Sequence, residues 1–268
     1  MDVDLAVDEV GRKLDKLPKK EHENLRSTYE RMLELGPERF QVKPSGLPVM
    51  DHLYDDLPNF YEVLDDVKRQ LALCEDSRDA LEITPLLLLG PPGIGKTHFA
   101  RELSQLLGTG MGFISMSSMT AGWVLSGASS QWKGAHDTAG SFIDEFAEVP
   151  IDASQVIWVA TANDARGIPD PILNRMNVYE VQAPDRDAAR HIATKLYAAI
   201  RTAHDWGKLF DEQACADVLD RMSEMAPREM RRAWMTAFGN AKLDRRSTIS
   251  TNDLPDAHQR RTTMGFVQ

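Results

Sequence analysis

One stretch of this chain constrains its fold more than any other: four consecutive leucines, Leu86 to Leu89, run directly into Gly90-Pro91-Pro92-Gly93-Ile94-Gly95-Lys96-Thr97. An apolar strand followed by G-x-x-x-x-G-K-T is the pattern of a P-loop, whose glycines let successive backbone N–H groups point at phosphate oxygens. The next segment has apolar residues at helical spacing and ends at Gly108, which suits a helix C-terminal cap. The motif therefore has the strand and the helix that a P-loop requires; a chance match of the bare pattern is the alternative.

The P-loop predicts a site for ATP together with Mg²⁺. Lys96 is expected to reach the β- and γ-phosphates, and the Thr97 hydroxyl is expected to hold Mg²⁺. A helix that begins at the end of the loop would add its positive N-terminal dipole. We therefore expect the nucleotide to be bound by Gly90, Pro91, Pro92, Gly93, Ile94, Gly95, Lys96, Thr97 and His98.

Composition and charge exclude several other classes of protein. The net charge is −10, and lysine and arginine form no dense block, since runs such as Lys19-Lys20, Arg231-Arg232 and Arg245-Arg246 are only pairs; this argues against a nonspecific nucleic-acid binder. The first residues are acidic, and no apolar run approaches the roughly 20 residues that span a bilayer. Cys74 and Cys215 are single and distant, which suggests neither a zinc site nor a disulfide framework. We expect a cytoplasmic protein that binds no membrane.

Strand and helix patterns alternate through the middle of the chain, which is typical of an α/β sheet. Strands are predicted at residues 84–89, 111–116, 156–160 and 177–181, and a helix at 58–75. The third strand is continuously apolar, as expected for a strand buried on both faces of a parallel sheet. We predict an α/β fold, in which a P-loop NTPase parallel sheet flanked by helices is followed by a small all-helical domain. The predicted division is a helical segment at 1–56, the α/β domain at 57–184 and helices at 185–268, where Asp185 caps the first one.

Two stretches after the third strand resemble motifs of AAA+ ATPases of the Lon branch. Val159-Ala160-Thr161-Ala162-Asn163 resembles sensor 1, which implies that Asn163 lies beside the P-loop strand and orients the attacking water; an Asn that caps the next turn is the alternative. Ile168-Pro169-Asp170-Pro171-Ile172-Leu173-Asn174-Arg175-Met176 resembles the I-P-x-P-L-L-x-R-M stretch of Lon proteases. The resemblance implies that Arg175 is an arginine finger that completes a neighbouring subunit's site. An ordinary surface arginine is the alternative.

Two more stretches resemble AAA+ motifs outside the sheet. Ala226-Pro227-Arg228 resembles the start of the sensor-2 helix in the AAA+ lid, which implies that Arg228 reaches from the lid to the phosphates. Arg231 and Arg232 are nearby alternatives, and a solvated helix face is another. Gln131-Trp132-Lys133-Gly134 resembles the aromatic–x–Gly pore loop of AAA+ unfoldases, in which Trp132 would grip an extended polypeptide. A tryptophan in the core is the alternative.

The resemblance covers residues from about 22 to 245 and concerns the ATPase module of Lon-type proteins, not their protease domain. It implies a hexameric ring that binds Mg·ATP and couples hydrolysis to protein remodelling. The pattern departs from the family at Walker B, for which the one candidate is Phe142-Ile143-Asp144-Glu145. Asp144 would hold Mg²⁺ through water, and Glu145 would polarise the nucleophilic water.

The residues before this candidate make a poor buried strand, so two surface acids are the alternative. By comparison with the family, roughly 40 residues are missing between Ala135 and His136, which corresponds to a helix, a strand and a second helix. Two functions are therefore the main candidates. One is an active ATPase, and the other is an ATP-binding module that no longer hydrolyses and acts as a nucleotide-dependent binding protein. A small-molecule P-loop kinase is a third function, against which the helical C-terminal region and the 159–176 stretch argue.

Overall fold

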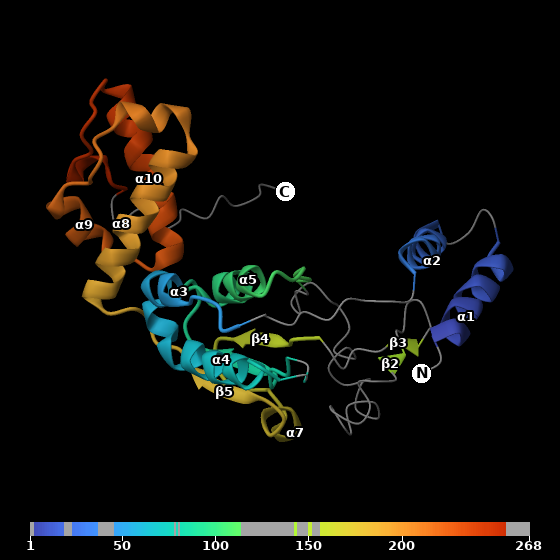
Figure 1. The fold of residues 1–268 in the computed structure, drawn as a ribbon. Helices are drawn as coiled ribbons and strands as arrows, with labels where there is room; N and C mark the ends of the chain where they lie inside the picture. Colours follow the sequence, from blue (N-terminus) through green and yellow to red (C-terminus); the bar gives the residue numbers. More distant parts are fainter. Residues whose placement is uncertain are drawn as a thin grey trace.

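The structure is a computed structural model that describes residues 3–18, 23–36, 46–77, 79, 81–113, 142–143, 150–151 and 156–255. Its buried residues form three separate hydrophobic clusters. One lies between two N-terminal helices, one covers the parallel sheet, and one fills a C-terminal helical bundle (Figure 1). The Trp132 segment, the Ala135–His136 junction, Asp144 and Glu145 lie outside the described residues.

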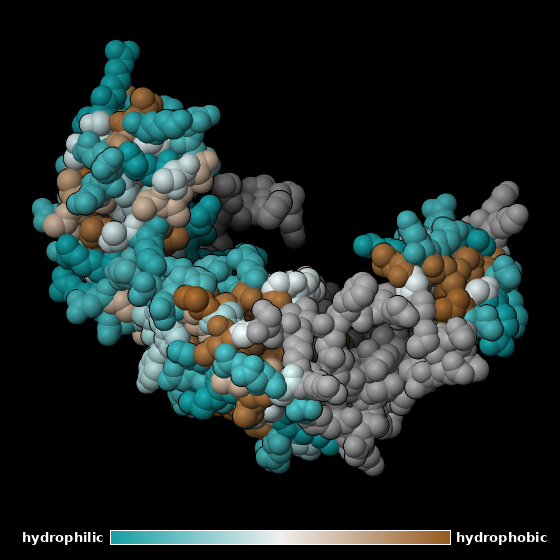
Figure 2. Space-filling view, in the orientation of Figure 1, coloured by the Kyte–Doolittle hydropathy of each residue, from teal (hydrophilic) through white to brown (hydrophobic). Residues whose placement is uncertain are grey.

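The N-terminal helices α1 (Val3–Lys16) and α2 (Glu23–Leu35) pack against each other. Val10 and Tyr29 are buried between them, and Leu25, Met32 and Leu33 pack around this pair. Figure 2 shows hydrophobic residues gathered where the two helices meet. The face of α2 that carries Leu25, Tyr29, Met32 and Leu33 is therefore the face that contacts α1.

The sheet contains three parallel strands in the order β4 (Val159–Ala162), β1 (Leu86–Leu89) and β5 (Asn177–Glu180). In the central strand, Leu86 pairs with Val159 on one side and with Asn177 on the other. All four leucines of β1 are buried, as expected for the central strand of a parallel sheet. The predictions of strands at 84–89 and 177–181 are confirmed.

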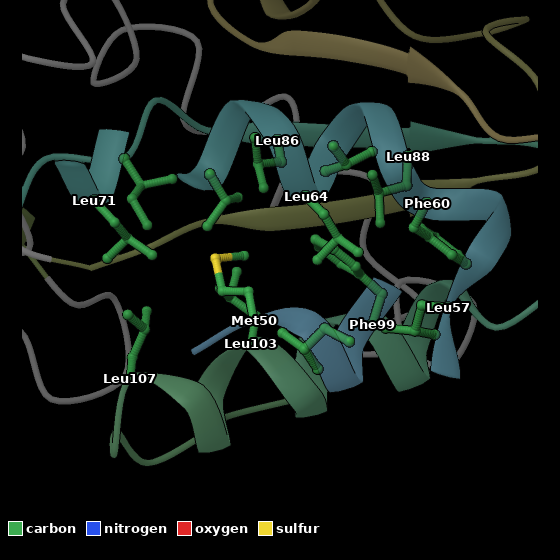
Figure 3. Close-up of a cluster of buried hydrophobic side chains, with 14 of the residues drawn as sticks. Met50, Leu57, Phe60, Leu64, Leu71, Leu86, Leu88, Phe99, Leu103 and Leu107 are labelled. Atoms are coloured by element: carbon green, nitrogen blue, oxygen red, sulfur yellow. The ribbon is translucent and has the colours of Figure 1, made fainter. Parts of the chain in front are cut away.

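Helices pack over β1 to form the main core. They are α3 (Asp51–Asp56), the 3-10 turn η1 (Pro58–Phe60), α4 (Tyr61–Leu73) and α5 (Lys96–Leu106). Side chains from η1, α4, α5 and β1 point into one cluster, in which Figure 3 labels Phe60, Leu64, Leu86, Phe99 and Leu103. Met50 and Leu53 belong to the same cluster, so α3 packs with the sheet although the predicted division falls after it.

The third predicted strand is displaced and less buried than expected. It begins at Val159 rather than at Val156, and Val156 and Trp158 are 47% and 41% exposed. The expectation that it is buried on both faces was wrong, because Thr161 is exposed and the other three residues of β4 are only partly buried; among the described residues β4 pairs with β1 alone. Residues 111–113 are not in a strand, and the rest of the predicted strand at 111–116 lies outside the described part. The short strands β2 (Phe142–Ile143) and β3 (Pro150–Ile151) form a separate antiparallel pair.

After the sheet every regular element of the described chain is a helix, as predicted. The helical bundle contains α8 (Arg186–Ala203), η6 (Asp205–Leu209), α9 (Ala216–Met222), α10 (Pro227–Leu243) and η7 (Thr251–Asp253). The Asp185 side chain accepts a hydrogen bond from the backbone N–H of Ala188 at 2.8 Å, which confirms the predicted N-cap of α8. Trp234 is fully buried in the bundle, and its indole N–H donates to the carbonyl of Ala193 at 3.0 Å.

Between β4 and β5 the chain also forms a one-turn helix, α7 (Asp170–Leu173). No helix within the described ranges is long and apolar enough to cross a bilayer. The face of the bundle seen in Figure 2 is largely hydrophilic.

Candidate nucleotide-binding site

The P-loop joins β1 to α5 in the way the sequence predicts. The chain bends at Gly90, where φ is +149°, and α5 begins at Lys96 directly after Gly95, where φ is +109°. A Cβ atom on Gly90 would stand 2.1 Å from the carbonyl oxygen of Val181. This first glycine is therefore required both by its backbone conformation and by the close approach of the chain that leaves β5.

Lys96 turns back into the loop. Its side chain is 9% exposed, and Nζ donates to the carbonyl of Gly90 and, at 2.8 Å, to that of Pro91. Burial lowers the pKa of Lys96. The ammonium group thus lies inside the loop, where phosphate oxygens could take the place of the two carbonyls as acceptors.

The base of the loop is anchored in the main core. Ile94 is 3% exposed, and Phe60 of η1 lies under Gly95, on which a Cβ would be 3.5 Å from the Phe60 ring. Phe60 stacks on Phe99 of α5, with ring centroids 5.2 Å apart. Because α5 is fixed in this way, its N-terminus and the loop N–H groups keep a constant direction.

The remaining residues of the predicted set lie on the outside of the loop and on the first turn of α5. Pro91, Pro92, Thr97 and His98 are exposed, and His98 Nδ1 lies 3.4 Å from Glu102 Oε1. An exposed hydroxyl in the first helical turn is accessible to a hydrated Mg²⁺ ion. At the other end of α5, Gly108 has a φ of +65° and its N–H bonds to the carbonyl of Gln105, which confirms the predicted C-terminal cap.

Asn163 follows β4 at the carboxyl edge of the sheet. The N–H of Gly90 donates to the carbonyl of Ala162 at 3.2 Å, so Asn163 comes directly after a residue that bonds to the P-loop. The following turn is closed by the next residue, because Asp164 Oδ1 accepts from the backbone N–H of Arg166 at 2.8 Å. The side-chain bond that closes this turn is therefore made by Asp164, and the sensor role of Asn163 stays a prediction.

Arg228 contacts the P-loop from the helical bundle. Its backbone N–H donates to the carbonyl of Gly93 at 3.2 Å, and a Cβ on Gly93 would stand 3.3 Å from Arg228 Cβ. Arg228 lies in the first turn of α10, so the positive ends of α5 and α10 both lie at the loop. Arg231 and Arg232 are exposed positions further along the helix.

Arg175 lies at the opposite end of the parallel strands from its own P-loop. It follows α7, donates from Nη1 to the carbonyl of Pro171 at 3.3 Å, and precedes β5 by two residues. Since Asn177 pairs with Leu86, this is the amino-terminal edge of the parallel strands. The P-loop leaves the other edge, about 13 Å away for a four-residue strand.

The Walker B candidate has a local setting unlike the one that its role requires. Asp144 and Glu145 themselves lie outside the described residues. Within the part of the chain that the structure describes, the preceding strand, β2, pairs with β3 alone and lies in a different sheet from β1. A catalytic carboxylate at the P-loop would need a parallel strand that ends at the same edge as β1.

Three contacts around the P-loop have no counterpart in the sequence prediction. Asn59 Nδ2 donates to the carbonyl of Gln182 at 3.0 Å and lies 3.4 Å from that of Ile94. Lys195 Nζ bonds to Asp56 Oδ1 at 2.6 Å, which joins α8 to α3. The third is the approach of Val181 to Gly90. No local motif marks these residues, because their partners are distant in the sequence.

Comparisons with known proteins agree with this site. The model of the ATPase family associated with various cellular activities (AAA) matches residues 86–134. Lon protease of Lachnoclostridium phytofermentans is 29% identical over 154 residues, which cover 40% of this chain and 19% of that protein. Lon protease of Clostridium beijerinckii is 24% identical over 248 residues, which cover 75% of this chain and 31% of that protein. The chain therefore matches less than a third of the length of these relatives.

A mitochondrial Lon protease homolog of Neurospora crassa is 24% identical over 196 residues, which cover 57% of this chain and 18% of that protein. Among solved structures, the RuvB Holliday junction branch migration motor of Thermotoga maritima is similar at a TM-score of 0.46 and 15% identity, over 79% of this chain and 70% of that one. The family-model match at residues 86–134 contains β1, the P-loop and α5.

Proposed function

We propose that this chain, whose P-loop region is a Lon-like AAA+ ATPase module, binds Mg·ATP and hydrolyses it to remodel other proteins in a ring. The observation that carries the proposal is the P-loop itself. A fully buried strand leads into a loop that encloses the Lys96 ammonium, and the first turn of α10 is bonded to that loop through Arg228.

The residues at the loop fit the nucleotide and its metal. Lys96 and the N-terminus of α5 would hold the phosphates, and the Thr97 hydroxyl would hold Mg²⁺, which neutralises phosphate charge when bound. Asn163 would orient the attacking water from the carboxyl edge of β4. Arg228 would connect the phosphates to the helical bundle, which takes the part of the AAA+ lid.

The position of Arg175 favours assembly. An arginine at the amino-terminal edge cannot serve as the finger for the P-loop at the other edge of its own sheet. It could serve a neighbouring subunit, and this supports a ring, for which we propose a hexamer in the cytoplasm. Trp132 would grip the polypeptide in the channel of such a ring.

The test is paired on one sample of the full chain: Mg·ATP binding by calorimetry and phosphate release. Lys96→Ala should abolish binding, because it removes the ammonium group inside the loop. Lys208→Ala, at an exposed position of the bundle, is the matched control and should bind as the unmodified chain does. Unchanged affinity in Lys96→Ala would refute the assignment of the site.

A second function is favoured by one observation, the place of β2 outside the parallel sheet. If no carboxylate follows a strand beside β4, the chain would bind ATP without turnover and act as a nucleotide-dependent binding protein. Binding without phosphate release in the paired experiment would support this function, and release would exclude it.

A further inference from the structure

The chain that leaves β5 passes directly beside the P-loop before it enters the helical bundle. We define residues 181–185, between β5 and α8, as the linker. Its first residue, Val181, donates its N–H to the carbonyl of Leu89 at 2.8 Å, and its carbonyl lies against Gly90. A change in the direction of the linker would therefore displace Gly90, the first residue of the loop.

One side chain holds the linker and the P-loop together. Asn59 Nδ2 donates to the linker carbonyl of Gln182 at 3.0 Å, with the P-loop carbonyl of Ile94 at 3.4 Å from the same nitrogen. Asn59 itself cannot drift, because the next residue, Phe60, is fully buried beneath Gly95 and stacked on Phe99. The amide therefore fixes the linker relative to the base of the loop.

Two contacts on the bundle side complete the connection. Lys195 of α8 is bonded to Asp56 of α3 at 2.6 Å, three residues before Asn59. Arg228 of α10 bonds to Gly93 through its backbone N–H. Both side chains of the Lys195–Asp56 ion pair are more than a third exposed, so salt weakens their attraction. The hydrogen bond of Asn59 joins neutral groups and does not depend on salt in this way.

We propose that Asn59 is a positioning residue that ties the linker to the P-loop and thereby fixes where Arg228 stands against the loop. A change at the phosphates would move the loop, the loop would move the linker through Asn59, and the bundle would follow. The response to nucleotide rests on the proposed function, but the tie itself does not.

The experiment measures the distance between the sheet domain and the bundle with two spin labels on the full chain. Cys215 is exposed in the bundle and takes one label. Leu73→Cys, at a position 78% exposed at the end of α4, takes the other, and Cys74→Ala removes the neighbouring thiol. This labelled background is compared with the same background carrying Asn59→Asp, which keeps the size of the side chain and removes the amide donor.

Two matched controls separate the tie from other effects. Gln182→Ala leaves the acceptor in place, because the bond is to the backbone carbonyl. Asn174→Asp adds the same charge at an exposed position of the same domain. Both controls should give the distance distribution of the background.

Without nucleotide, Asn59→Asp should broaden the distribution by about twofold while the melting temperature stays close to that of the background, as expected when a tie between two folded units is lost. Asn59→Ala, which adds no charge, is measured as well and should broaden it too. An unchanged distribution in both variants would overturn the proposal. So would equal broadening in Gln182→Ala.

With Mg·ATP, the background should shift to a new distance and Asn59→Asp should bind the nucleotide but shift less. A full shift in the variant would overturn the proposed coupling. If the background does not bind Mg·ATP at all, the proposed function fails, and the arm without nucleotide still decides whether Asn59 ties the linker.

Discussion

Replacement of Asp253 by Asn should destabilise the helical bundle by an amount that the structure allows us to work out. Asp253 accepts from both ends of the Arg246 guanidinium, at 2.5 and 2.8 Å, and from the backbone N–H of Ser250 at 2.7 Å. These bonds lower the pKa of Asp253 from 3.8 to about 2, first through Arg246. Since one pKa unit corresponds to about 1.4 kcal/mol, the ionised carboxylate contributes about 2 kcal/mol to the free energy of unfolding at neutral pH.

The matched control is Asp244→Asn, because Asp244 binds the same arginine. Asp244 Oδ2 lies 2.9 Å from Arg246 Nη2, but its side chain is 66% exposed, whereas that of Asp253 is 4% exposed. Exposed ion pairs contribute about 1 kcal/mol or less. We therefore expect Asp253→Asn to lower the free energy of unfolding at least twice as much as Asp244→Asn does, although both variants remove one negative charge.

The loss should also depend on pH in a defined direction. The pKa of Asp253 is lower in the folded bundle than in the unfolded chain, so its contribution is present above about pH 4 and disappears as the pH falls toward 2. Urea unfolding followed by tryptophan fluorescence, to which the buried Trp234 contributes, measures both variants between pH 7 and pH 3. Equal losses in the two variants, or a difference that does not shrink below pH 4, would refute the reasoning from burial.

The remaining predictions concern the proposed reaction and are read by phosphate release. Arg175→Ala should reduce hydrolysis more than binding, and mixing it with Lys96→Ala should restore part of the activity, because each supplies what the other lacks; no restoration would count against a finger in trans. Trp132→Ala should spare basal hydrolysis but reduce stimulation by a protein substrate, whereas equal loss of both would place Trp132 in the core. Glu145→Gln should leave binding unchanged, and whether hydrolysis survives distinguishes the two readings of this residue as a surface acid or as the water-polarising acid.

The predictions from sequence succeeded where the interacting residues are neighbours in the chain. The P-loop, the cap at Gly108 and the N-cap at Asp185 each depend on residues within a few positions, so the local pattern carries them. The helix predicted at 58–75 is also present as α4, because apolar residues at helical spacing depend on the local sequence alone.

The third strand was misplaced for a physical reason. Hydrophobicity marked residues 156–160, but the pairing with β1 selects Val159 to Ala162 and includes the polar Thr161. An apolar run indicates that a segment favours burial. It does not indicate which of its residues pair with a neighbouring strand. In the same way, Asn59 could not be predicted, because Ile94 and Gln182 come to it from segments far along the chain.

The site as described separates nucleotide binding from turnover. Binding needs positive charge and donors, and these come together at the carboxyl edge of β1 from Lys96, the start of α5 and Arg228. Turnover also needs a carboxylate that accepts a proton or polarises water. Asp164, which lies beside Asn163, is a poor candidate, because Arg166 donates to both of its oxygens and lowers its pKa. If the chain hydrolyses ATP as proposed, a carboxylate other than Asp164 supplies this step, and a change at that acid should abolish phosphate release and leave the affinity for Mg·ATP intact.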